Sequence, residues 1–246
     1  MSYQASFKVW RGDDDDGGLE DFTVEVNEGE VVLDIIHRLQ ATQTPDLAVR
    51  WNCKAGKCGS CSAEINGRPR LMCMTRMDTL PKDRPVTLQP MHAFPLLRDL
   101  VTDVSWNYRV KEKIKPFAPR KPDADDGTWR MDQRDVDRVQ EFRKCIECFL
   151  CQDVCHVLRE HEKHEQFIGP RFLVYSAALE MHPLDTGDRV DDLKQTQGIG
   201  YCNITKCCTN VCPEHIAITD NAIIPLKERV VDRFYDPVRR LFRVFA

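Results

Sequence analysis

Apolar residues near the start of the chain occur in short runs that are rich in β-forming residue types. Residues 7–10 and 22–26 are two such runs, and the polar loop between them contains four consecutive aspartates at 13–16, followed by Gly17 and Gly18. This pattern predicts a β-hairpin. In residues 31–41 the apolar positions 32, 35, 36 and 39 lie on one face of a helix. An amphipathic helix is therefore expected to lie across the hairpin.

The next segments predict a second hairpin and then a change to helices. Asn66-Gly67 is a dipeptide typical of a hairpin turn, and residues 86–88 predict a closing strand. The prolines at 116, 119 and 122 lie in an irregular, basic connector. Beyond it, residues 135–144, 171–180 and 221–234 have helical patterns, and Gly169-Pro170 precedes the second of them. Strands followed by helices predict an α+β fold.

Composition and charge exclude several classes of function. The chain has 246 residues and a net charge of -4, which gives no general attraction to nucleic acid, so no nucleic-acid partner is expected. Its apolar runs are far shorter than the ~18 residues that indicate a membrane span. The N-terminus lacks the pattern of a signal peptide, so we expect a reducing cytoplasm. Twelve cysteines in that compartment indicate metal or redox chemistry.

The first set of cysteines has the spacing of a plant-type ferredoxin. Cys53-x4-Cys58-x2-Cys61 with a distant Cys73 is the ligand pattern of a [2Fe-2S] cluster. The loop also contains glycines at positions 56 and 59, which permit backbone angles that other residues disfavour. A tight loop of this kind can wrap a cluster and direct backbone N–H groups at its sulfurs, which helps to set the reduction potential.

Two later runs of cysteines have the spacing of a two-cluster bacterial ferredoxin. The first is Cys145-x2-Cys148-x2-Cys151-x3-Cys155, and the second is Cys202-x5-Cys208-x3-Cys212 followed by Pro213. In such ferredoxins the fourth cysteine of each run binds the cluster of the other run. The predicted ligands of a [4Fe-4S] cluster are therefore Cys145, Cys148, Cys151 and Cys212. The predicted ligands of the remaining cluster are Cys155, Cys202 and Cys208.

This remaining site lacks one ligand. Thr205 stands where the spacing calls for a cysteine, and its side chain has no thiolate. A [3Fe-4S] cluster, which lacks the iron at that corner, is therefore the predicted occupant. Cys207 belongs to none of the three sets, because the spacing to Cys212 selects its neighbour Cys208. We interpret Cys207 as a small buried residue, with a role as a ligand as the alternative.

Zinc sites and disulfides are the other common uses of paired cysteines. A four-coordinate zinc site needs two pairs, whereas a plant-type quartet and two interlocking runs together include eleven of the twelve cysteines. A disulfide framework is disfavoured because no export signal is present. Iron–sulfur clusters therefore explain the pattern best, and a structural zinc protein that binds other proteins or nucleic acid is the weakest hypothesis.

Taken in order, the motifs resemble the iron–sulfur subunit of succinate dehydrogenase and fumarate reductase. The match runs from the plant-type quartet through Cys145-Ile-Glu-Cys148 and Phe167-Ile-Gly-Pro170 to Cys212-Pro213, which is nearly the whole chain. The resemblance implies a β-grasp [2Fe-2S] ferredoxin domain over residues 1–108 and a linker arm over 109–128. It also implies a helical ferredoxin domain over 129–246 that carries the [4Fe-4S] and [3Fe-4S] clusters.

The same resemblance implies a function and partners. The chain would relay electrons through the three clusters, between a FAD-containing flavoprotein subunit that interconverts succinate and fumarate and a membrane anchor subunit where quinone reacts. It would be a peripheral protein on the cytoplasmic face of the cell membrane. The chain has no Gly-x-Gly-x-x-Gly after a strand and no candidate acid and base for carbon chemistry, so no catalytic residue is predicted on it.

Several positions depart from the pattern of many quinone-linked members of that family. His156 follows Cys155 where those members have a proline, and Asn203 follows Cys202 where they have a histidine. Arg159 and Glu160 stand where those members have tryptophans. His156 and Asn203 are the candidate neighbours of a quinone. A different quinone, a different anchor or a quinone site made mainly by the anchor subunit would account for the departures. The main alternative function is a ferredoxin-like electron carrier, either free or as a subunit of another oxidoreductase.

The end of the chain is basic. Residues 226–246 contain six basic and three acidic residues, and the last of them alternate arginines with apolar side chains. Such a segment suits the surface of an anchor subunit or of anionic lipid. A last helix packed on the domain is the alternative.

Overall fold

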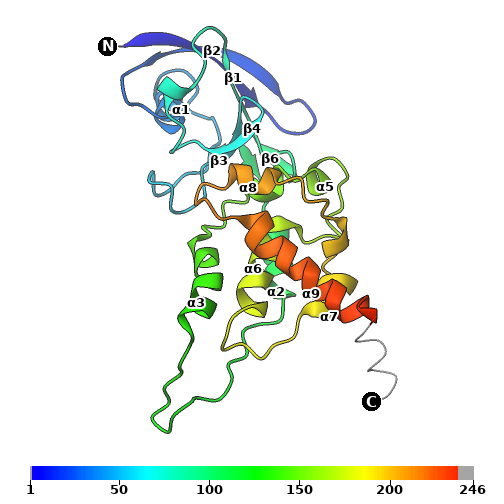
Figure 1. The fold of residues 1–246 in the computed structure, drawn as a ribbon. Helices are drawn as coiled ribbons and strands as arrows, with labels where there is room; N and C mark the ends of the chain where they lie inside the picture. Colours follow the sequence, from blue (N-terminus) through cyan, green and yellow to red (C-terminus); the bar gives the residue numbers. More distant parts are fainter. Residues whose placement is uncertain (1, 238–246) are drawn as a thin grey trace.

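The computed structural model describes residues 2–237 and places a sheet at one end of the molecule and most helices at the other (Figure 1). The sheet has five strands in the order β2-β1-β5-β3-β4. β1 (Tyr3–Arg11) pairs antiparallel with β2 (Gly18–Val26) and parallel with β5 (Val86–Gln89). β3 (Ser62–Ile65) pairs antiparallel with both β5 and β4 (Arg68–Leu71). Both predicted hairpins and the predicted closing strand are confirmed.

The core of this domain lies between the sheet and α1 (Val32–Thr42). The predicted apolar positions of α1 are buried, and Leu33 joins them. At the turn between β3 and β4, Asn66 and Gly67 have φ angles of 52° and 71°. Two successive positive φ angles match the twist of a tight hairpin, and asparagine and glycine adopt them at the least cost. The turn places Cys61 and Cys73 at the same end of this hairpin, one residue before β3 and two residues after β4.

The segment after β5 leaves the sheet and packs mostly on the helical domain. It contains β6 (Leu96–Arg98) and β7 (Val101–Thr102), which pair with each other, and α2 (Ser105–Glu112). Met91, Phe94 and Val110 belong to the core of the helical domain. The predicted boundary between residues 108 and 109 therefore falls inside α2, because the chain begins to build the second core before the sequence turns basic and proline-rich.

The helical domain is arranged around α6 (Gly169–Glu180), whose buried side chains include Phe172, Leu173 and Ala177. The other helices are α3 (Gln133–Gln140), α4 (Leu150–Asp153), α5 (His156–Arg159), α7 (Val190–Gln195), α8 (Cys207–Val211) and α9 (Ile224–Phe234). The short turns are η1 (Met77–Thr79), η2 (Glu141–Lys144), η3 (Ile199–Tyr201) and the π-helical η4 (Ile218–Ile223). The α+β fold is thus confirmed.

Two predicted helices are less regular in the structure. Residues 135–144 comprise α3 and the tighter turn η2, and residues 221–234 comprise the end of η4 and then α9. Pro225 lies in the first turn of α9 and has no N–H to donate, so the regular hydrogen-bond pattern is interrupted there.

The connector between α2 and α3 is irregular, as predicted, and Arg189 anchors it. The fully buried guanidinium of Arg189 donates to the carbonyls of Lys115 and Pro116 at 2.9 and 2.6 Å, and to Asp185 at 2.9 Å. The main-chain carbonyls of an irregular segment lack the donors that a helix or a sheet would supply. The guanidinium of Arg189 supplies donors to two of them.

The basic end of the chain is described only in part. Leu226 and Val230 of α9 are buried in the helical core, whereas residues 238–246, on which the predicted membrane contact rests, lie outside the described residues. Within residues 2–237 no helix has the length and apolar character to cross a bilayer.

Candidate iron–sulfur sites

The plant-type loop brings together the four predicted [2Fe-2S] ligands. Cys61 and Cys73 are buried at the end of the β3–β4 hairpin, and the N–H of Cys73 donates to the sulfur of Cys61 at 3.5 Å. Cys53 is exposed, and its sulfur accepts N–H groups from Ala55 and Lys57 at 3.4 and 3.3 Å. Backbone N–H groups thus point at sulfurs, as expected of a loop that wraps a cluster.

The thiols of this loop differ in their acidity. Burial raises the pKa of Cys61 to about 12. Burial also opposes ionisation of Cys58, but hydrogen bonds from Ser60 and Cys53 outweigh it and lower the pKa of Cys58 to about 6. A cluster binds thiolates, so the buried thiols release protons when the site is filled.

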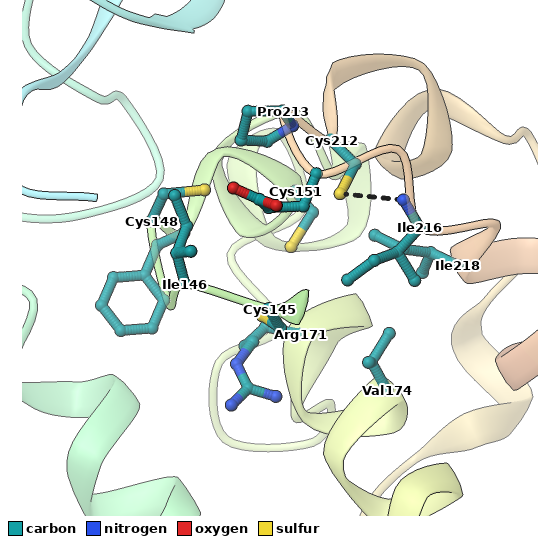
Figure 2. A pocket seen from close by; sticks show the side chains of 12 residues that line it. Cys145, Ile146, Cys148, Cys151, Arg171, Val174, Cys212, Pro213, Ile216 and Ile218 are labelled. Atoms are coloured by element: carbon teal, nitrogen blue, oxygen red, sulfur yellow. Dashed lines mark hydrogen bonds between the residues drawn. The ribbon is translucent and has the colours of Figure 1, made fainter. Parts of the chain in front are cut away.

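The second site is a hollow lined by the sulfurs of Cys145, Cys148, Cys151 and Cys212. Figure 2 shows the sulfurs of Cys148, Cys151 and Cys212 turned toward one space, with the Ile216 N–H donating to Cys212 at 3.4 Å. Burial raises the pKa of Cys148 to about 12 and that of Cys151 well above its ordinary value. Cys212 of the second run therefore lies beside the three cysteines of the first run.

The third site is a separate hollow that contains Cys155, Cys202 and Cys208. Thr205 and Cys207 also line it, and the Thr205 hydroxyl and the Cys207 sulfur are 3.3 Å apart. Cys207 is half-buried, so it is more accessible than predicted. Burial raises the pKa of Cys155 to about 11, and hydrogen bonding to Cys207 together with burial raises the pKa of Cys208.

The two hollows of the helical domain have matching backbones. In the first run, Glu147 and Phe149 on either side of Cys148 have φ angles of 54° and 60°. In the second run, Ile204 and Lys206 on either side of Thr205 both have φ angles of 61°. Such angles are uncommon for residues other than glycine. Their repetition at matching positions identifies Thr205 as the structural counterpart of Cys148.

The two candidate quinone neighbours also lie together at the third hollow. The Asn203 side-chain nitrogen and His156 Nε2 are 3.0 Å apart, and both residues line the hollow. Tyr201 and Ile204, close to them in sequence, are large exposed side chains. The structure thus joins two positions that the sequence separates by 47 residues.

The plant-type loop touches the wall of the second hollow. The Ser62 hydroxyl lies 2.8 Å from the Cys148 carbonyl and 2.9 Å from the Gly59 carbonyl. A Cβ added to Gly59 would come within 2.7 Å of the Cys148 Cα. Only glycine therefore allows so close an approach at position 59. The loop that contains Cys53, Cys58 and Cys61 thus contacts the loop that contains Cys148.

Several residues around these sites carry no signal in the sequence. Ser62, Glu147 and Arg171 are ordinary polar residues until the fold places them beside a ligand. The one sequence signal that could have identified them is that they lie next to Cys61, Cys148 and the Gly169-Pro170 helix start.

The residues present fit iron–sulfur clusters. Each of the three sites gathers three or four cysteine sulfurs, which are the ligands that such clusters use. Backbone N–H groups point at sulfurs in the first two sites, and apolar side chains such as Ile216, Ile218 and Val174 line the second. When bound, clusters at these sites supply reversible one-electron chemistry.

Comparison with known proteins agrees with this geometry. The family described as a 2Fe-2S iron-sulfur cluster binding domain matches residues 6–108, and the family described as a 4Fe-4S dicluster domain matches residues 141–216. A fumarate reductase iron-sulfur subunit from Mycobacterium tuberculosis is 32% identical over 200 residues, which is 79% of each chain. A succinate dehydrogenase iron-sulfur subunit from Paracoccus denitrificans is 28% identical over 92% of this chain and 88% of its own length.

A solved structure is similar over almost the whole chain. One chain of the Mycobacterium smegmatis Sdh1 complex in the apo form is 68% identical, with a TM-score of 0.93, over 97% of this chain and 100% of its own length.

Proposed function

Because the chain belongs to the iron–sulfur subunits of succinate dehydrogenase and fumarate reductase, we propose that it joins a FAD-containing flavoprotein to a membrane anchor that binds quinone. Electron transfer is the role of this family, and no carbon chemistry is assigned to the chain itself. The exposed side chains at the two ends of its row of cluster sites support these two partners.

The proposed ligands follow the three sets of cysteines that the fold brings together. Cys53, Cys58, Cys61 and Cys73 hold a [2Fe-2S] cluster, and Cys145, Cys148, Cys151 and Cys212 hold a [4Fe-4S] cluster. Cys155, Cys202 and Cys208 would hold a [3Fe-4S] cluster, and Thr205, which also lines this hollow, offers no fourth thiolate. The matching backbone of Thr205 and Cys148 supports the vacancy.

The proposed electron relay is supported by one observation, that each cysteine site adjoins the next. The first and second sites meet where Ser62 and Gly59 contact Cys148. The second and third sites are joined by α4, since Cys151 lies within it and Cys155 two residues after its end. Successive sites thus share walls made by their own ligands, which keeps the path between them short.

The two ends of this row favour different partners. At the [2Fe-2S] end, Cys53 is exposed beside the exposed side chains of Trp51 and Met74, which suits a protein partner such as the flavoprotein. At the other end, Asn203 and His156 lie beside the exposed Tyr201 and Ile204, which suits the anchor and its quinone. The chain would then lie on the cytoplasmic face of the membrane as a peripheral subunit.

The crossed ligands give the sharpest test. In the purified complex, Cys212→Ser should alter the EPR signal of the four-iron cluster and spare that of the three-iron cluster. Cys155→Ser should do the reverse, while Cys58→Ser should alter the [2Fe-2S] signal alone. If Cys212→Ser removed the three-iron signal and spared the four-iron one, the ligand assignment would be wrong.

The partners need a separate readout. In the complete wild-type complex, succinate should reduce the [3Fe-4S] cluster and so remove its oxidised EPR signal. Added quinone should reoxidise the cluster and restore the signal. If all three clusters were present and neither reagent changed their signals, the alternative of an electron carrier for another oxidoreductase would be favoured.

A further inference from the structure

Arg171 is a buried cation in the wall of the [4Fe-4S] hollow. It is the third residue of α6, and only 5% of its surface is exposed. Within residues 2–237, one basic and one acidic side chain line this hollow, Arg171 and Glu214. Figure 2 shows Arg171 on the side of the hollow that lies away from Pro213 and Cys212. No prediction from the cysteine motifs depends on this residue.

The charges around Arg171 do not cancel. Arg171 Nη2 contacts Glu147 Oε1 at 2.6 Å, and the same oxygen accepts from Lys111 Nζ at 2.6 Å. Glu147 is thus the carboxylate that both cations share, through a single oxygen. Two cations and one carboxylate leave a net charge of +1.

The other charged group at this hollow is neutralised. Glu214 pairs with Lys57 of the plant-type loop, and their charged atoms are 3.1 Å apart. This pair contributes no net charge. The remaining positive charge therefore belongs to the Arg171 group, and Arg171 is its most buried member.

The position of Arg171 is fixed by its surroundings. Its guanidinium carbon lies 5.5 Å from the ring centroid of Tyr175, and its main-chain N–H donates to Gln152 at 3.1 Å. Its Nε is buried and has no hydrogen-bond partner. Buried donors without partners are rare in proteins, so this one indicates a function that the protein chain alone does not satisfy.

We infer that Arg171 raises the reduction potential of the [4Fe-4S] cluster, an inference that rests on the proposed ligands of that site. Gain of one electron makes the occupied site more negative by one charge. A fixed positive charge in its wall, screened little by water, stabilises the reduced form more than the oxidised form. Arg171 thus acts on the cluster through its charge and does not bind iron.

The test is a redox titration monitored by EPR on the complete complex. Arg171→Met removes the charge and keeps much of the side-chain volume, so the midpoint potential of the four-iron cluster should fall. Arg171→Lys keeps the charge and should restore most of the wild-type value. The [2Fe-2S] and [3Fe-4S] potentials, measured in the same samples, should stay unchanged and serve as internal references.

Glu147→Gln gives an independent test, because it removes the counter-charge and should raise the same potential. If Arg171→Met fails to assemble the cluster, Arg171→Gln, which is also neutral, takes its place and should lower the potential in the same way. Equal potentials in wild type, Arg171→Met and Glu147→Gln would overturn the inference, as would equal falls in Arg171→Met and Arg171→Lys. Absence of a four-iron signal in the wild-type complex would instead overturn the proposed function, and the inference with it.

Discussion

At the scale of single residues, we predict that Thr205 determines which cluster the third site holds. Its neighbours Ile204 and Lys206 repeat the positive φ angles that flank Cys148 in the first run. Thr205→Cys should therefore present a thiolate at the vacant corner without a change in backbone. We expect the oxidised three-iron EPR signal to disappear and a reducible four-iron signal to replace it.

Thr205→Ser is the matched control, since it keeps a hydroxyl and should keep the three-iron signal. An undiminished three-iron signal in reconstituted Thr205→Cys protein would contradict the assigned vacancy.

Cys207 is the other residue whose role a single substitution can decide. It matches Leu150 of the first run, which is buried in the N-terminal core and is not among the residues that line the [4Fe-4S] hollow. Cys207→Ala should therefore leave iron content and all three EPR signals intact, and should lower the free energy of unfolding by about 1 kcal/mol or less. Loss of the three-iron signal would show that Cys207, which does line its hollow, is a ligand.

At the scale of elements, the approach of two loops depends on one glycine. Gly59 has a φ angle of 69°, and a Cβ there would clash with the Cys148 backbone. Gly67 has nearly the same φ, 71°, but a Cβ there would meet nothing within 4 Å. Gly59→Ala should therefore lower the free energy of unfolding by about 1–3 kcal/mol more than Gly67→Ala does.

Thermal unfolding of the two variants measures this difference. Gly59→Ala should also weaken the magnetic interaction between the reduced [2Fe-2S] and [4Fe-4S] clusters, whereas Gly67→Ala should not. Equal destabilisation by both alanines would mean that backbone strain alone is responsible and that the loops can separate freely.

At the scale of the whole molecule, a buried carboxylate joins the two modules. Glu64 of β3 is 1% exposed. It accepts from Arg159 of α5 at 3.3 Å and lies 2.8 Å from His92 Nδ1. Glu64→Gln leaves the partly buried Arg159 with only the exposed Glu160 as a counter-charge, and should lower the free energy of unfolding by about 1–3 kcal/mol.

The same cluster predicts how stability depends on pH. Burial raises the pKa of Glu64, but His92 and Arg159 outweigh it and lower it below 4.5, so its contribution is lost as pH falls through the lowered value. The hydrogen bond to Glu64 raises the pKa of His92 above 6.5, so the contribution of His92 is lost as pH rises through the raised value. The stability difference between wild type and Glu64→Gln should therefore shrink as pH rises from about 6 to 9. Burial and the Glu64 charge raise the pKa of Asp153 to about 7, so it titrates in the same range. A constant difference over this range would show that neither His92 nor Asp153 is coupled to Glu64.

The sequence by itself predicted the two kinds of module, their order along the chain and the three sets of cysteines. Spacings such as x2 and x3 place thiols on one turn of the chain, and apolar positions such as those of α1 repeat with the period of a helix. Both signals are local, so they can be seen without the fold. Even the predicted crossing of Cys155 and Cys212 follows from the repeat of one run by the other.

Only the tertiary structure decided what lies between the sites. The contact of Ser62 with Cys148 joins residues 86 positions apart, and the pair of Glu64 and Arg159 joins residues 95 positions apart. No local pattern marks such partners, because serine, glutamate and arginine acquire these roles only when docking removes them from water. The same holds for Arg171, whose charge matters because the fold buries it in the wall of a hollow made by cysteines from both runs.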